Sequence, residues 1–132
     1  MPEINWLAVL VAALAAFGAG ALWYSPVLFA AQWRKELGFS AEDAQGTPFV
    51  RIMASAFVLI FLATVVFAMF LGPSPGFGFG LGTGFLAGLF WVAAMTGVHY
   101  LFEQRSLRLW LINGGYNTVV FTIIGGVLGA FS

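Results

Sequence analysis

Four long apolar stretches alternate with short polar segments along the chain. The apolar stretches cover residues 5–24, 48–71, 77–101 and 107–131. Each has the roughly 20 residues that an α-helix needs to cross a bilayer, and lipid offers no partners to the edge of an open sheet. The pattern therefore predicts an all-α fold. We expect an integral membrane bundle of four transmembrane helices that forms a single domain over residues 1–132.

Turn-forming residues separate the predicted spans. A Thr-Pro pair at 47–48 caps the start of the second span, and the run Gly-Pro-Ser-Pro-Gly at 72–76 makes a short turn before the third. A Ser-Pro pair at 25–26 gives another cap, and apolar and charged positions alternate after it. We expect residues 26–37 to form a short amphipathic helix at the cytoplasmic interface. The alternative is a first helix that continues past a proline kink.

The composition excludes a soluble protein. Hydrophobic residues make up 61% of the 132 positions, charged residues only 8%, and the net charge is zero. A soluble domain carries about 25% charged residues, so this chain cannot cover a surface that faces water. A net charge of zero also argues against nucleic acid as a partner. There are no cysteines, which excludes disulfides, thiolate metal sites and cysteine nucleophiles.

All basic residues fall on one side of the predicted bundle. They lie in or beside the loops that follow the first and third spans: Arg34, Lys35, Arg51, Arg105 and Arg108. Basic residues mark the cytoplasmic ends of membrane spans. The charge pattern therefore predicts a multi-pass protein with both of these loops in the cytoplasm and both termini outside it.

Small residues recur every four positions on three of the predicted helices. Helices in lipid associate through close backbone approach at such residues, so we expect the first, third and fourth helices to pack tightly and the second to face more lipid. The stripes are Ala8, Ala12, Ala16 and Gly20; Gly76, Gly80, Gly84 and Gly88; and Gly114, Thr118, Thr122, Gly126 and Ala130. Gly78 and Gly82 add a second narrow face. One stripe is a candidate subunit interface, and a glycine zipper that lines a pore is the alternative.

Polar side chains within the predicted spans gather toward the cytoplasmic side. Asn113, Tyr116 and Asn117 share one helix face because they are three and four residues apart. We expect His99 to lie level with Asn113, and Met95 level with Asn117. The candidate ligand-binding residues are Tyr24, His99, Trp110, Asn113, Tyr116 and Asn117. Three interpretations stay open: hydrogen bonds that only join helices, a ligand pocket open toward the cytoplasm, or a proton relay through His99.

The sequence contains no recognisable catalytic or metal-binding pattern. A single histidine with no cysteine and no carboxylate in mid-span cannot supply the usual ligands of a metal. Paired carboxylates and a Ser-His-Asp arrangement are also missing. We therefore expect no enzyme activity, no cofactor and no bound metal.

Several segments resemble the DUF1761 family. They are residues 5–9 (Asn-Trp-Leu-Ala-Val), 20–26 (Gly-Ala-Leu-Trp-Tyr-Ser-Pro) and 109–116 (Leu-Trp-Leu-Ile-Asn-Gly-Gly-Tyr), together with His99 and Phe102. The run Leu-Trp-Tyr-Ser-Pro is the most specific of these. The resemblance implies a small four-helix protein, mainly bacterial, with no assigned biochemical function. It therefore implies a location in the bacterial inner membrane.

Three functions remain open at this stage. The first is a non-enzymatic membrane protein that oligomerises, by default as a homodimer, and binds a lipid, a small apolar molecule such as a quinone, or another membrane subunit. The second is a small transporter or channel that works as a homo-oligomer. Small multidrug transporters rely on a membrane-embedded Glu, which the first helix lacks, so proton-coupled cation export is disfavoured. The third is an intramembrane enzyme that uses His99 with Tyr24 or Asn113.

Overall fold

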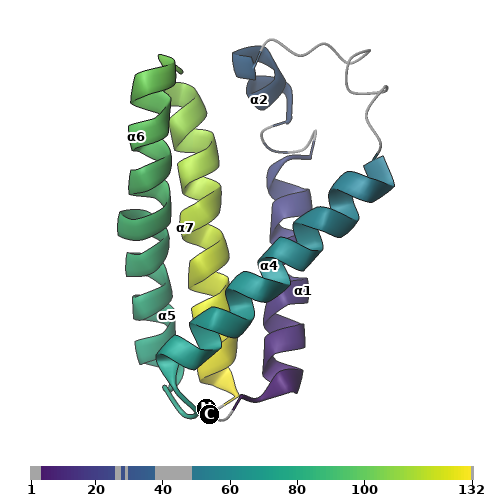
Figure 1. Ribbon diagram of the computed structural model, residues 1–132, viewed down its shortest axis with the longest axis vertical. Helices are drawn as coiled ribbons and strands as arrows, with labels where there is room; N and C mark the ends of the chain where they lie inside the picture. Colours follow the sequence, from purple (N-terminus) through teal and green to yellow (C-terminus); the bar gives the residue numbers. More distant parts are fainter. Residues whose placement is uncertain (1–3, 26–27, 29, 38–48, 132) are drawn as a thin grey trace.

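The computed structural model describes residues 4–25, 28, 30–37 and 49–131, and the regular structure within them is helical (Figure 1). Four of the described helical segments are long and apolar enough to cross a membrane: Trp6–Trp23, Val50–Leu71, Phe77–Glu103 and Leu107–Ala130. This confirms the predicted all-α fold and the bundle of four membrane-spanning helices.

The helices begin and end close to the predicted boundaries. They are α1 (Trp6–Trp23), α2 (Ala30–Leu37), α4 (Phe49–Leu71), α5 (Phe77–Leu86), the π-helical segment η1 (Ala87–Ala93), α6 (Ala94–Glu103) and α7 (Leu107–Ala130). Asn5 caps α1 by accepting a hydrogen bond from the backbone N–H of Ala8 at 3.1 Å. Ser106 caps α7 in the same way, accepting from the N–H of Leu109 at 3.0 Å.

A separate helix follows the first span. Because α1 ends at Trp23 and α2 begins at Ala30, the alternative of one continuous kinked helix is wrong. Part of the segment between these helices lies outside the described residues, and so does the predicted cap at residues 47–48.

The central helix of the bundle is α7. Figure 1 shows α5, η1 and α6 stacked end to end as one rod beside α7, while α1 lies on the other side and α4 crosses the bundle on a diagonal. Among the described spans α7 is the most buried and α4 the least. This arrangement agrees with the expectation that the first, third and fourth helices pack tightly while the second faces lipid.

Close backbone contact between α5 and α7 explains why glycines recur on the facing sides of these two helices. A Cβ at Gly80 would collide with the carbonyl of Gly125, and one at Gly84 with the carbonyl of Phe121. Each close approach requires a residue without a side chain. The sequence prediction did not include Gly125 or Gly129, although both make such contacts, Gly129 with Gly76.

The remaining predicted packing residues lie on α1 and α7. On α1, Ala12 and Ala16 are fully buried against the core of the bundle, and Gly20 accommodates the ring of Tyr116. On α7, Gly126 meets the side chains of Leu81 and Phe77. The neighbouring hydroxyls bond within their own helix: Thr118 donates to the carbonyl of Gly114 at 2.9 Å and Thr122 to that of Thr118 at 2.7 Å.

The π-helical segment shifts the small-residue stripe by one position. The stripe follows four-residue steps through Gly80, Gly84 and Gly88, but after Gly88 the small residues that contact α7 are Ala93, the last residue of η1, and Gly97. The step from 88 to 93 is five residues, which is the spacing of a π-helical turn. Every side chain after η1 is therefore turned by about one residue relative to an unbroken α-helix.

Candidate functional site

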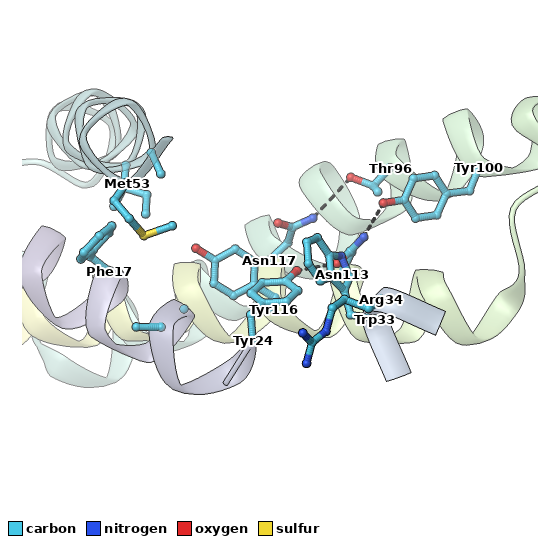
Figure 2. Close-up of a pocket in the computed structure, with 14 residues that line it drawn as sticks. Phe17, Tyr24, Trp33, Arg34, Met53, Thr96, Tyr100, Asn113, Tyr116 and Asn117 are labelled. Atoms are coloured by element: carbon cyan, nitrogen blue, oxygen red, sulfur yellow. Dashed lines mark hydrogen bonds between the residues drawn. The ribbon is translucent and has the colours of Figure 1, made fainter. Parts of the chain in front are cut away.

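A cavity of about 800 Å³ lies between the helices in the half of the bundle that contains α2 (Figure 2). Five elements contribute to its lining: Phe17, Gly20, Ala21 and Tyr24 from α1 and its end; Trp33 and Arg34 from α2; Met53, Ala56 and Ile60 from α4; Thr96 and Tyr100 from α6; and Asn113, Tyr116 and Asn117 from α7.

The diagonal course of α4 creates this space. The described parts of α4 pack mainly against α1 and, to a smaller extent, α7. In Figure 1 the N-terminal half of α4 runs away from α6, although residues of both helices line the cavity. Small residues on the walls, Gly20, Ala21 and Ala56, leave the volume unfilled. The cavity is therefore bordered on one side by two helices with little mutual packing.

One end of the cavity is apolar. Phe17 and Met53 lie at this end in Figure 2, on the far side of Tyr116 from Tyr100 and Thr96. The ring of Phe17 makes an edge-to-face contact with Phe57, with 5.7 Å between centroids, and Ile60 extends the apolar wall along α4. This part of the lining suits a hydrocarbon chain or an aromatic ring.

The opposite end carries a hydrogen-bonded network centred on Asn113. The hydroxyl of Tyr24 donates to Asn113 Oδ1 at 2.5 Å, and Asn113 Nδ2 donates to the hydroxyl of Tyr100 at 2.6 Å. One amide thus joins α1, α7 and α6. Burial, followed by the nearby rings of Tyr116 and Tyr100, raises the pKa of Tyr24, the residue after the α1 span, above its usual range.

A second bond joins α7 to α6 one turn further along. Asn117 Nδ2 donates to Thr96 Oγ1 at 3.3 Å, and Thr96 in turn donates to the carbonyl of Val92 at 2.9 Å. Tyr116 lies between the two asparagines and packs edge-to-face on Tyr24, with 5.2 Å between ring centroids. Its hydroxyl makes no hydrogen bond with a described residue, and Figure 2 shows it directed toward the side where Met53 and Phe17 lie.

At the α2 side, the cavity is covered by a short helix that contacts two spans. The ring of Trp33 packs edge-to-face on Tyr24 at 5.3 Å. Glu36 accepts a 2.6 Å hydrogen bond from the hydroxyl of Ser106 and lies 3.8 Å from the Nε of Arg108. These contacts place Trp33 and Arg34 beside the polar network.

Comparison with known proteins places the chain in a family. The model of one family, described as a protein of unknown function, DUF1761, matches residues 7–129. The chain belongs to the DUF1761 family. No curated protein and no solved structure shows significant similarity to it. In this DUF1761 protein the segments 20–26 and 109–116, which carry the resemblance, supply Tyr24, Asn113 and Tyr116 to the cavity.

The structure brings together four of the six candidate ligand-binding residues. Tyr24, Asn113, Tyr116 and Asn117 all line the cavity. Trp110 does not line it. Its ring packs over Gly97 and Gly114, and its Nε1 donates to the carbonyl of Ala93 at 2.8 Å, so Trp110 serves the contact between the third and fourth spans.

The expectation for His99 is not met by the geometry. His99 is exposed and does not line the cavity. We expected His99 to lie level with Asn113 and Met95 level with Asn117, and the observed hydrogen-bond partners are the adjacent residues Tyr100 and Thr96. Adjacent residues of a helix lie about 1.5 Å apart along its axis but about 100° apart around it, so depth alone did not decide which of the two faces α7.

Several residues that line the cavity were not predicted from the sequence. Thr96 and Tyr100 are four residues apart, so a search for polar pairs on one face of the third span would have found them. Trp33 and Arg34 lie on the amphipathic segment, which periodicity places at the interface but not against Tyr24. The position of Phe17 in the cavity could not be predicted, because an apolar residue of a span can equally well face lipid.

The described residues of the cavity offer hydrogen-bonding and apolar groups. They contain no group of three or more His, Asp or Glu side chains close enough to bind a metal ion. The cavity lining identified above consists of amides, hydroxyls, one guanidinium and apolar groups. The arrangement can bind and orient a molecule through hydrogen bonds and apolar contact.

Proposed function

We propose that this DUF1761 protein is a non-enzymatic protein of the bacterial inner membrane that binds a lipid or another small apolar molecule in the cavity. The observation that carries the proposal is the divided lining of a cavity of about 800 Å³, apolar around Phe17 and Met53 and polar around Asn113. Ligand sites commonly enclose roughly 300–1,000 Å³ and combine apolar walls with a few placed polar groups. A membrane amphiphile has the matching two parts.

Access from the bilayer supports a ligand that is dissolved in the membrane. The cavity is bordered by α4 and α6, and the main packing partners of the described part of α4 are α1 and α7. A molecule that diffuses in the lipid can therefore reach the cavity sideways between Met53 and Thr96.

The distribution of charge supports a definite orientation in the membrane. In Figure 1, α1 begins and α7 ends at one end of the bundle, while α2 lies at the other. Arg34, Arg105 and Arg108 all lie at the α2 end. By the positive-inside rule, that end faces the cytoplasm, both termini lie outside, and the cavity occupies the cytoplasmic half of the bundle.

An outward-facing pair of glycines supports assembly into a homo-oligomer. Gly78 and Gly82 are exposed on α5, and a Cβ at either would meet no atom of the described chain within 4 Å. Close approach at glycines is a common means of helix association in lipid. We propose a homodimer through this face, and the same exposed surface is available to another membrane subunit.

Ligand retention tests the proposed function. Ala56→Trp places an indole inside the cavity, while Ala54→Trp adds the same group to the exposed surface of α4 and serves as a matched control. The protein is released from its membrane in mild detergent, and bound small molecules are identified by native mass spectrometry. We expect a retained molecule with the wild type and Ala54→Trp but not with Ala56→Trp. Equal retention by all three folded proteins would contradict the proposal.

A further inference from the structure

Some tyrosine hydroxyls of the cavity donate a hydrogen bond within the protein, and others have no acceptor among the described residues. Asn113 has one carbonyl oxygen, and the Tyr24 hydroxyl donates to it. Tyr100 accepts from Asn113 Nδ2, so the hydrogen of the Tyr100 hydroxyl has no acceptor among the described residues. The Tyr116 hydroxyl likewise makes no hydrogen bond within the described chain. Two tyrosine donors of this site therefore remain available to a bound molecule.

The polar atoms of the cavity that are not used within the protein include both donors and acceptors. Thr96 receives the amide of Asn117 and donates its own hydrogen to Val92. The carbonyl oxygen of Asn117 and the hydroxyl oxygens of Tyr24 and Tyr116 have no donor within the described network. Because the hydrogens of the Tyr100 and Tyr116 hydroxyls can bond only to an acceptor, a bound molecule that accepts hydrogen bonds can use both of them.

The charges around the cavity favour an uncharged ligand. No carboxylate belongs to its described lining, so a cationic head would have no counter-ion. The one cation, Arg34, already interacts within the protein. An anionic head would have to compete for it or enter unpaired, and burying an unpaired charge is costly.

We propose that the cavity binds an uncharged membrane amphiphile that carries carbonyl groups, of the ester or quinone class, and that these carbonyls accept hydrogen bonds from the hydroxyls of Tyr100 and Tyr116. The ring or chain of the ligand then lies between Phe17 and Met53. This inference rests on the proposed function, since it names the class of molecule that the cavity binds.

Four probes with one decyl tail separate the head group from the tail. They are decyl-benzoquinone, decylbenzene, decyltrimethylammonium and decyl phosphate, which offer a carbonyl, no polar group, a cation and an anion. Binding is measured by isothermal titration calorimetry on the detergent-solubilised protein. We expect decyl-benzoquinone to bind at least about tenfold more tightly than each of the other three, because two neutral hydrogen bonds contribute at least this much.

Conservative variants test the assigned donors. Tyr116→Phe and Tyr100→Phe keep the rings and remove one hydroxyl each. Each is expected to weaken the binding of decyl-benzoquinone about three- to tenfold, while the affinity for decylbenzene stays unchanged. The melting temperature should stay unchanged in Tyr116→Phe and fall slightly in Tyr100→Phe, which also removes the acceptor of the Asn113 amide. An equal effect on both probes would overturn the role of the hydroxyls, and so would no effect on either.

The outcomes distinguish this inference from the proposed function. If decylbenzene or a charged probe binds as tightly as the quinone and Ala56→Trp abolishes that binding, the cavity binds amphiphiles but the carbonyl assignment is wrong. If the four probes bind the wild type and Ala56→Trp equally, or none binds the wild type, both the inference and the proposed function are overturned.

Discussion

Tyr24 at the end of α1 donates a 2.5 Å hydrogen bond to Asn113 on α7, although the two residues are 89 positions apart in the chain. The same amide donates to Tyr100 on α6 at 2.6 Å. One asparagine therefore connects three helices at the end of the bundle where the cavity lies. The bridge has two consequences, because it stabilises the fold and fixes the positions of two tyrosine rings.

The contribution of the Asn113 bridge to stability is measured with Asn113→Leu, which removes both hydrogen bonds. Side-chain hydrogen bonds within membranes average about 0.6 kcal/mol each, so we expect the free energy of unfolding to fall by about 1.2 kcal/mol. Tyr24→Phe removes one bond and should cost about half as much. Reversible unfolding in mixed micelles measures both values. A loss from Tyr24→Phe that equals or exceeds the loss from Asn113→Leu would show that the amide is not the centre of the network.

The contact between α5 and α7 predicts opposite effects for two neighbouring glycines. Gly84→Ala places a methyl group against the carbonyl of Phe121 and should lower the free energy of unfolding by about 1–3 kcal/mol. Within one monomer, Gly82→Ala adds a methyl group that meets no described atom, so it should raise the free energy of unfolding of the monomer by up to about 1 kcal/mol, because alanine favours the helix. Thermal unfolding of the two variants beside the wild type provides the comparison. Equal effects would mean that α5 does not approach α7 along this face.

The hydropathy of the chain is sufficient to predict the four spans, because the bilayer sets both their length and their composition. The shared face of Asn113, Tyr116 and Asn117 was equally predictable, since α7 is a regular helix over those positions. The residues of the third span that bond to this face could not be predicted. The depth of a residue along the third span did not decide which of two adjacent side chains faces α7. The π-helical turn η1 also moves the small-residue contact to Ala93 and Gly97, and none of its apolar residues distinguishes it from an α-helix.

The packing of the helices accounts for the other differences between the sequence predictions and the structure. A tryptophan near a membrane interface is typical of an aromatic belt, yet the Nε1 of Trp110 bonds to a backbone carbonyl in the contact between two spans. The diagonal course of α4 determines the size of the cavity. It depends on how side chains of α4 pack on α1, and a pattern of apolar positions does not specify a crossing angle.

The outward glycines of α5 predict a change of assembly without a change of fold. The double variant Gly78→Leu, Gly82→Leu fills the narrow face with bulky side chains whose Cβ atoms would have no described neighbour within 4 Å in the monomer. We expect the molar mass in mild detergent, measured by light scattering, to fall from that of a dimer to that of a monomer while helix content is kept. A wild type that is already monomeric would refute the proposed dimer, as would a variant of unchanged mass.

The orientation is tested with reporters fused at two positions. A phosphatase that is active only outside the cytoplasm should be active when fused after Ser132 and inactive when fused after Gln104, which lies between α6 and α7. The expectation follows from the basic residues at the α2 end. The reverse pattern would place the cavity in the outer half of the bundle and invalidate the proposed topology.

The central claim is that the cavity between α1, α4, α6 and α7 is a binding site for a membrane amphiphile. An experimental structure of the protein grown from a lipid mesophase tests it most directly. We expect elongated density inside the cavity, with its polar end beside Asn113 and Tyr100 and its apolar end beside Phe17 and Met53. A structure in which α4 closes against α6 and leaves no space between them would contradict it.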